Sequence, residues 1–162
     1  MQAPPPGRQR AFTIVEMLVT IVIVSILASV ALPMVELSLQ RQKEQELRRD
    51  LQIIREALDQ YHQAIDEGRV MRKAAASGYP RSLDMLVEGV PDAKSASGAK
   101  LYFLRRVPRD PFFPDPSTAA ADTWGKRSYA SSADEPKEGD DVYDVYSLAP
   151  GAGLNGVAYR EW

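Results

Sequence analysis

The longest apolar run of the chain covers residues 12–33, close to the N-terminus. Val, Ile, Leu, Ala and Met dominate this run, and Glu16 is its only charged residue. A helix of about 20 apolar residues is long enough to span the hydrocarbon core of a bilayer. The pattern therefore predicts a transmembrane helix over residues 12–35.

The next segment, residues 36–70, is polar with a regular apolar stripe. It contains no Gly or Pro before Gly68 and is rich in residues that favour helices. We expect it to continue the same helix as an amphipathic segment. The stripe is either a coiled-coil seam for a partner or, as we favour, the ridge against which the chain's own C-terminal region packs. Its members recur in steps of three and four, and so share one helix face: Leu47, Leu51, Ile54, Leu58, Tyr61 and Ile65.

A proline stands where the apolar run ends. Pro33 has no backbone N–H, and its ring clashes with the preceding turn of a helix. We therefore predict that the helix kinks or loosens at Pro33.

Residues 71–162 read as a mixture of short elements. Gly78-Tyr79-Pro80 breaks the helix, and a short helix capped by Ser82 follows. Residues 91–100 read as a loop. A small antiparallel sheet covering the helical stripe would give an α+β fold, with a long N-terminal helix packed on a C-terminal sheet. The predicted short helix covers residues 82–87, and the predicted strands cover residues 126–130, 141–148 and 156–159.

Composition narrows the function classes. A chain of 162 residues is sized for one domain, and its formal charge of -2 gives no reason to expect nucleic acid as a partner. The sequence has no Cys, which excludes disulfides and thiolate metal sites.

The charges beside the apolar run set its orientation. Arg8 and Arg10 precede the run and stay cytoplasmic by the positive-inside rule, so the residues after it lie on the periplasmic side. A secretory signal peptide cleaved near Ala31, or a plain membrane anchor, is the alternative. Neither alternative gives Glu16 a function inside the membrane, where a charged side chain has a high free-energy cost.

The residues around the start of the apolar run carry a family resemblance. Arg10-Ala11-Phe12-Thr13-Ile14-Val15-Glu16-Met17-Leu18-Val19 resembles the prepilin motif of type IV pilins and type II secretion pseudopilins. The resemblance implies that residues 1–11 are a cytoplasmic leader, that prepilin peptidase cuts between Ala11 and Phe12, and that Phe12 is then methylated. Most family members have Gly before the cut, so Ala11 is expected to slow processing. Glu16 and Pro33 stand where the family has its assembly glutamate and its helix-loosening proline.

The C-terminal half is similar to the G-type major pseudopilin of type II secretion. The similar parts are Tyr79-Pro80, residues 104–111, residues 143–148 before a Gly-rich loop, and Trp162. Residues 112–124 depart from the short Asp-Pro-Trp-Gly turn of that family. The departure leaves the choice between a major and a minor subunit open.

Few residues of the sequence are candidates for catalysis or metal binding. His62, the only histidine, reads as a solvated residue of the helix face rather than a general base, and nothing completes a catalytic triad. Carboxylates in the late loops could bind calcium, although a solvated acidic loop is the simpler interpretation. Asp141 and Asp144 are the candidates there, and Glu161 stands near a position that binds calcium in G-type pseudopilins. We expect no cofactor and no enzymatic activity.

The resemblance therefore implies a structural subunit of a type II secretion pseudopilus. Such a subunit waits in the bacterial inner membrane as a single-pass protein, with residues 36–70 and 71–162 in the periplasm. Its partners are prepilin peptidase, the assembly platform with its ATPase, other pseudopilins and further copies of itself. The alternatives are a type IV pilin or minor pseudopilin, an anchored sensor and an anchored enzyme. Glu16 is expected to pair with the Phe12 amine during assembly.

Overall fold

The computed structural model describes residues 13–72 and 76–162. The chain divides into two compact units, Met1–Gln40 and Arg41–Trp162, which we describe separately. The leader, Ala11 and Phe12 lie outside the described residues, so the expectations placed on them stay predictions.

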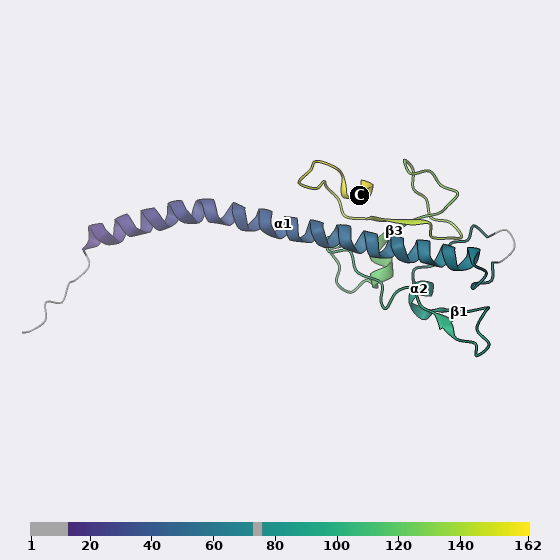
Figure 1. Ribbon diagram of the computed structural model, residues 1–162. Helices are drawn as coiled ribbons and strands as arrows, with labels where there is room; N and C mark the ends of the chain where they lie inside the picture. The colour runs from purple at the N-terminus through teal and green to yellow at the C-terminus, as the bar shows by residue number, and fades with distance from the viewer. Residues whose placement is uncertain (1–12, 73–75) are drawn as a thin grey trace, which may run out of the picture. The chain divides into compact units, whose positions relative to one another are not determined.

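One helix, α1 (Ile14–Asp66), accounts for the described part of the first unit and the beginning of the second (Figure 1). Its 53 residues include Pro33, and the helix is not interrupted there. The proline therefore does not end the helix, and the predicted kink or loosening at this position stays a prediction.

The C-terminus of α1 is closed by a glycine in the left-handed region. Gly68 has a φ of 68°, and its N–H donates to the Ile65 carbonyl at 2.8 Å, while the Arg69 N–H donates to the Ala64 carbonyl at 2.8 Å. This pair of bonds is a Schellman motif, which satisfies carbonyls that the last helical turn leaves open. Because of it, the helix ends at Asp66 and not at the predicted boundary near residue 70.

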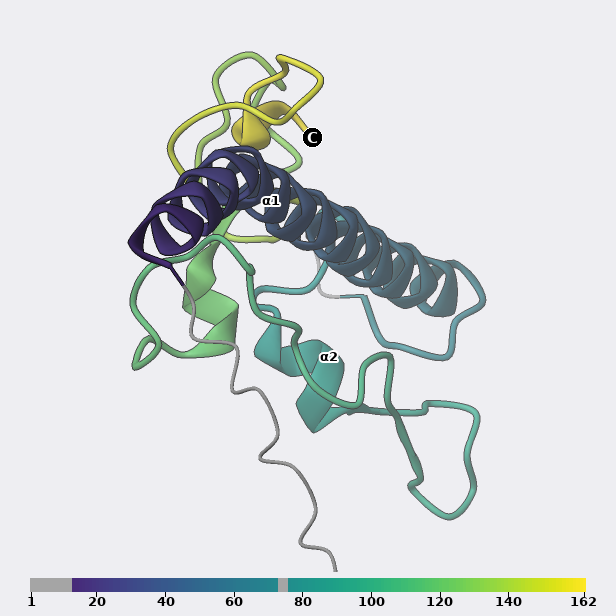
Figure 2. The ribbon, with the colours of Figure 1, turned by 90° about the vertical axis from the view of Figure 1, so that its left-hand side faces the viewer.

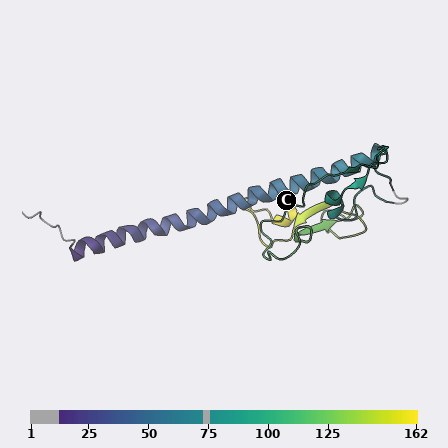
Figure 3. The same ribbon diagram turned by 90° about the horizontal axis from the view of Figure 1, so that it is seen from below.

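The remaining elements of the second unit are short. They are α2 (Asp84–Glu88), β1 (Val90–Pro91), β2 (Lys100–Leu101), the 3₁₀ helix η1 (Ala120–Thr123), β3 (Trp124–Arg127), β4 (Asp144–Ser147) and the 3₁₀ helix η2 (Tyr159–Glu161). Strands β1 and β2 pair antiparallel, as do β3 and β4, where Trp124 lies opposite Ser147. Figure 3 shows these elements on one side of the α1 segment of this unit. In Figure 2, α2 lies on one flank of α1 and the C-terminal residues on the other.

The predicted helix bounds, strand bounds and capping residue need correction. Ser82 does not cap α2, because the cap position is Leu83 and no side chain bonds there. Residues 90–91 and 100–101 pair, so the predicted loop 91–100 closes a hairpin. Residues 156–159 form no strand, because a tight turn at residues 153–157 leaves room only for the single bridge between Ala152 and Ala158.

The apolar stripe of α1 lies at the centre of the core. Leu47 and Ile54 are fully buried, and Ile65 is partly buried against the same cluster. They pack with buried side chains from the rest of the unit, among them Leu86, Trp124 and Val145. The favoured interpretation is confirmed: the stripe is the ridge against which the chain's own C-terminal region packs. The α+β fold, with small antiparallel sheets against a long helix, is confirmed as well.

Candidate functional site

The apolar side chains of the first unit that the structure describes are exposed on all sides of the helix. An 18-residue window of α1 has a mean hydropathy of 2.6, and none of it is buried within the chain. A helix that is apolar all round is stable only in lipid or among other helices. By length and composition α1 can therefore cross a membrane.

Glu16 lies exposed in the first turn of this apolar helix. Its backbone N–H donates to the Thr13 hydroxyl at 3.2 Å. Thr13 thus caps the helix, and a Glu three residues after a capping Thr has the spacing of a capping box. Sequence reasoning missed this role of Thr13, although the spacing was visible. A carboxylate in the first turn is also favoured by the helix dipole.

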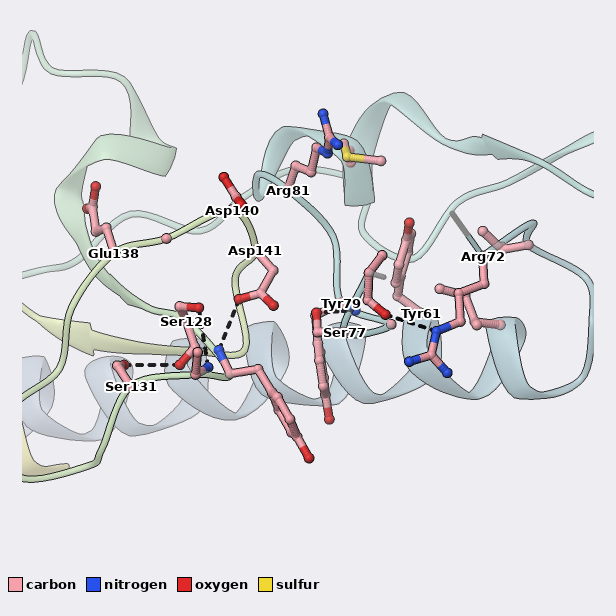
Figure 4. A pocket seen from close by; sticks show the side chains of 18 of the residues that line it. Tyr61, Arg72, Ser77, Tyr79, Arg81, Ser128, Ser131, Glu138, Asp140 and Asp141 are labelled. Atoms are coloured by element: carbon pink, nitrogen blue, oxygen red, sulfur yellow. Dashed lines mark hydrogen bonds between the residues drawn. The ribbon is translucent and has the colours of Figure 1, made fainter. Parts of the chain in front are cut away.

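The second unit contains a cavity of about 1400 Å³. It is formed by the last turns of α1 at Tyr61 and Ile65, the segment after α1, and the loop that follows β3 (Figure 4). Tyr79 lies among its lining residues, with its ring 5.9 Å from the Tyr129 ring in a stacked arrangement. The His62 ring lies 4.7 Å from the Tyr79 ring. The lining of the cavity therefore includes three aromatic side chains, Tyr61, Tyr79 and Tyr129.

Polar groups that line the cavity form hydrogen bonds within its loops. Asp141 accepts a hydrogen bond from the Tyr129 N–H at 2.9 Å, and Ser131 donates to the Ser128 carbonyl at 3.0 Å. Burial acts to raise the pKa of the Asp141 carboxyl, but hydrogen bonds from Ser77, the Tyr129 amide and Ser128 outweigh it and hold that pKa below its usual value. Asp141 therefore stays ionised while it fixes the loop.

The side chain of His62 contacts Asp66 and Tyr79. Its Nδ1 lies 3.3 Å from the Asp66 carboxylate one turn along α1, and its other ring contact is Tyr79. This placement is that of a helix-face residue, half-buried beside the cavity.

The calcium candidates do not converge on one point in the part of the chain that the structure describes. Asp144 binds Arg55 Nε at 2.8 Å through one oxygen and the Arg127 guanidinium at 3.0 Å through the other. Asp141 is held by the loop bonds described above, and Glu161 is exposed on η2. Within residues 13–72 and 76–162, no group of three or more His, Asp or Glu side chains could hold a metal. The expectation of no cofactor stays a prediction.

Two polar residues of α1 that the sequence reasoning missed anchor the C-terminal segment. Arg55 also donates to the Val145 carbonyl at 3.1 Å and to a Trp162 oxygen at 2.7 Å. Glu44 is buried, and its Oε1 accepts hydrogen bonds from the Leu154 N–H at 2.9 Å and the Tyr159 hydroxyl at 3.2 Å. Glu44 lies three residues before Leu47 and so continues the buried stripe, which is the signal that could have identified it.

A comparison with known proteins adds one match. A family model described as a prokaryotic N-terminal methylation motif matches residues 6–32. No curated protein and no solved structure matches the chain. Together with the apolar start of α1 and the α+β fold, this match shows that the chain carries the processing motif of type IV pilin-like prepilins.

Proposed function

We propose that the protein is a structural subunit of a type II secretion pseudopilus, stored in the inner membrane and assembled into a periplasmic filament that drives protein export. The observation that carries the proposal is the methylation motif at residues 6–32, which overlaps an exposed apolar helix. An anchored sensor or enzyme needs neither the motif nor Glu16.

The proposal has a physical basis in the apolar half of α1, which would contact lipid in the membrane and other helices in the filament. In the bilayer its exposed side chains, such as Ile14 and Leu27, contact lipid. In a filament the same side chains contact the helices of other subunits, so that no apolar surface meets water at either stage. The same helical segment can then anchor the stored subunit in the membrane and join it to other subunits in the filament.

Processing releases the partner that Glu16 needs. Cleavage between Ala11 and Phe12 by prepilin peptidase creates a positive amine at Phe12, which is then methylated. On insertion scales a lone charge at the centre of a membrane helix costs about 2.5 to 3.5 kcal/mol, which is an upper value for Glu16 in the first turn of α1. Pairing with the Phe12 amine of a neighbouring subunit offsets that cost and sets the axial register of each added subunit.

A type IV pilin or a minor pseudopilin is the second candidate. The observation that favours it is the segment 112–124, which departs from the G-type pattern and contains η1. These subunit types differ in copy number. Counting subunits in sheared filaments therefore separates a major subunit from a minor one, and an export assay separates a pseudopilus from a surface pilus.

The decisive experiment is mass spectrometry of the full chain isolated from membranes. The expected product begins at Phe12 and carries one additional methyl group. In a strain without prepilin peptidase the chain should keep Met1 or its immediate neighbours. A membrane form that begins near Ala31, or keeps the leader despite an active peptidase, would contradict the proposal.

A further inference from the structure

The turn before η2 holds the only asparagine of the sequence, Asn155, and Gly156 follows it. Asparagine is chemically labile. The backbone nitrogen of the next residue can attack its side-chain carbonyl, and a glycine at that place has no Cβ to obstruct the attack. The pair is therefore a candidate for spontaneous deamidation, a modification that needs water and no enzyme.

Deamidation converts the Asn155 carboxamide into a carboxylate through a cyclic imide. The Gly156 nitrogen loses its proton to solvent and forms a bond to the Asn155 Cγ, while the bond from Cγ to Nδ2 breaks and ammonia leaves. Water then adds to one of the two imide carbonyls. Addition at Cγ gives aspartate, and addition at the backbone carbonyl gives isoaspartate, whose main chain is longer by a methylene. The net change is an amide and water giving a carboxylate and an ammonium ion.

Solvent reaches the side chain of Asn155. Asn155 is exposed and lines a groove of about 530 Å³ together with Arg48 of α1 and Trp162. Water and solvent bases therefore have access to both reacting groups, so burial does not prevent the reaction.

The turn at residues 153–157 holds both reacting groups by hydrogen bonds. The Gly156 N–H donates to the Gly153 carbonyl at 2.8 Å, and the Asn155 Oδ1 accepts a bond from the Val157 N–H at 3.1 Å. The Gly156 nitrogen has to give up its bond before it can lose its proton and attack. The reaction therefore requires a local opening of the turn, and its rate depends on the free energy of that opening.

Contacts with α1 and η2 keep the turn closed. The carboxylate of Glu44, which is buried, accepts a hydrogen bond from the Leu154 N–H at 2.9 Å. The Val157 carbonyl accepts bonds from the Gly153 N–H at 2.9 Å and from the Trp162 indole N–H at 3.2 Å. Opening the turn at Asn155 therefore disturbs bonds that tie it to the rest of the unit.

We propose that Asn155 is a site of spontaneous deamidation, which the closed turn slows and which Glu44 restrains by holding Leu154 to α1. Residues 149–157 contain no charged side chain, so the product places the first carboxylate in this segment. That carboxylate follows the residue whose N–H binds Glu44, and two like charges repel each other. The isoaspartate product also lengthens the main chain inside the turn. Deamidation therefore releases residues 153–157 from α1.

The first test compares the rate of deamidation in the folded and unfolded states of the full chain. The folded chain is kept in detergent, and a second sample is unfolded in guanidinium chloride at the same pH and temperature. Peptide mapping by mass spectrometry measures conversion of Asn155, and an isoaspartate methyltransferase detects isoaspartate. The folded chain should react at least tenfold more slowly, which corresponds to an opening free energy of about 1.4 kcal/mol.

Asn155→Gln is the control for the assignment of the site. It should give no conversion at this position on the same timescale, since a glutamine has to close a larger ring. An unfolded chain in which Asn155 stays unchanged, or equal rates in the two states, would overturn the proposal.

A pair of variants at Glu44 provides the second test. Glu44→Ala removes the acceptor for the Leu154 N–H and should raise the rate in the folded chain about tenfold. Glu44→Gln keeps an acceptor oxygen and should retain most of the protection. Melting curves identify a variant that does not fold. Equal rates in the two folded variants would overturn the role of Glu44.

Hydrogen exchange of the unchanged chain tests the restraint without a substitution. The Gly156 N–H should exchange at least tenfold more slowly in the folded chain than in the unfolded chain, because it is bonded to the Gly153 carbonyl. Equally fast exchange in the two states would show that the turn is open, and would overturn the proposal even if Glu44→Ala does not fold.

Discussion

Residues 14–40 and 41–66 belong to one continuous helix, yet their apolar side chains meet different surroundings. In the first segment apolar side chains lie exposed on every face, as Ile14 at 82% shows. In the second they are confined to one stripe that the rest of the unit buries. The first segment therefore needs lipid or other helices around it to be stable, whereas the second is completed by its own chain.

The comparison also separates the roles of two acidic residues. Glu16 is a carboxylate in an apolar segment, and the partner proposed for it belongs to another molecule. Glu44 is a carboxylate in the amphipathic segment, and its partners at Leu154 and Tyr159 belong to the same molecule. The same residue type thus has a proposed role in assembly in one segment and an observed role in folding in the other.

The largest expected effect comes from removing the charge of the apolar segment. Glu16→Leu should leave membrane insertion intact and abolish most filament formation and secretion, because the cost of a buried charge disappears together with its pairing. Electron microscopy and an export assay, in a strain with no wild-type copy, measure this. Glu36→Leu, at an exposed position farther along α1, is the control and should retain filaments. Normal filaments from Glu16→Leu would refute the assembly role.

The next effect tests the buried stripe against its exposed neighbour. Ile54→Asp should lower the free energy of unfolding by about 3–5 kcal/mol, because an unpaired carboxylate enters the core. Ile53→Asp, one residue away and 38% exposed, should change it by less than about 1 kcal/mol. Thermal melting of the full chain in detergent gives both values. Similar losses in the two variants would mean that the stripe is not the core.

A smaller effect is expected from the pH dependence of the amphipathic segment. Burial and the neighbouring Glu46 raise the pKa of Asp50 from 3.8 to about 6. Between these values the folded chain binds more protons than the unfolded chain, so the free energy of unfolding should fall as pH rises from 4 to 6. Asp50→Asn should remove that fall and stabilise the protein at pH 7 by at most about 1 kcal/mol, since solvent screens a partly exposed group.

Melting curves at pH 4, 5, 6 and 7 measure the effect of Asp50→Asn. Asp59→Asn, on the exposed surface of the same helix, serves as the control and should keep the wild-type pH dependence. If the free energy of unfolding of Asp50→Asn falls with pH as steeply as that of the wild type, then the raised pKa of Asp50 does not cause the pH dependence.

The smallest expected effect concerns calcium. A ligand that binds only the folded state raises its stability by mass action. Because Arg55 and Arg127 hold both oxygens of Asp144, saturating calcium should shift the melting temperature by less than about one degree. The quantity to compare is the calcium-dependent shift, since Asp144→Ala alone also breaks two ion pairs. A shift of several degrees that is lost in Asp141→Ala and Asp144→Ala would show a calcium site.

Several local features were predictable because they depend on neighbours along the chain. The stripe from Leu47 to Ile65 follows from periodicity. Residue type predicted a strand over residues 141–148, and the observed strand β4 covers only Asp144–Ser147 of it. Ser82 was a wrong cap because α2 begins later, with Leu83 at its cap position. The third strand failed because glycines and Asn155 favour a turn, and backbone bonds at residues 153–157 close it.

By itself the sequence determined the apolar helix, its single charge, the buried stripe and the processing motif, since each is a pattern of adjacent or helically spaced residues. Only the tertiary structure decided which polar residues hold the second unit together. Arg55 bonds Asp144 and Trp162 across the chain, and Glu44 bonds the Leu154 N–H, 110 residues away in sequence. Such pairs form because folding brings together segments that are far apart in the sequence. The pattern of neighbouring residues does not predict which of these distant side chains will meet.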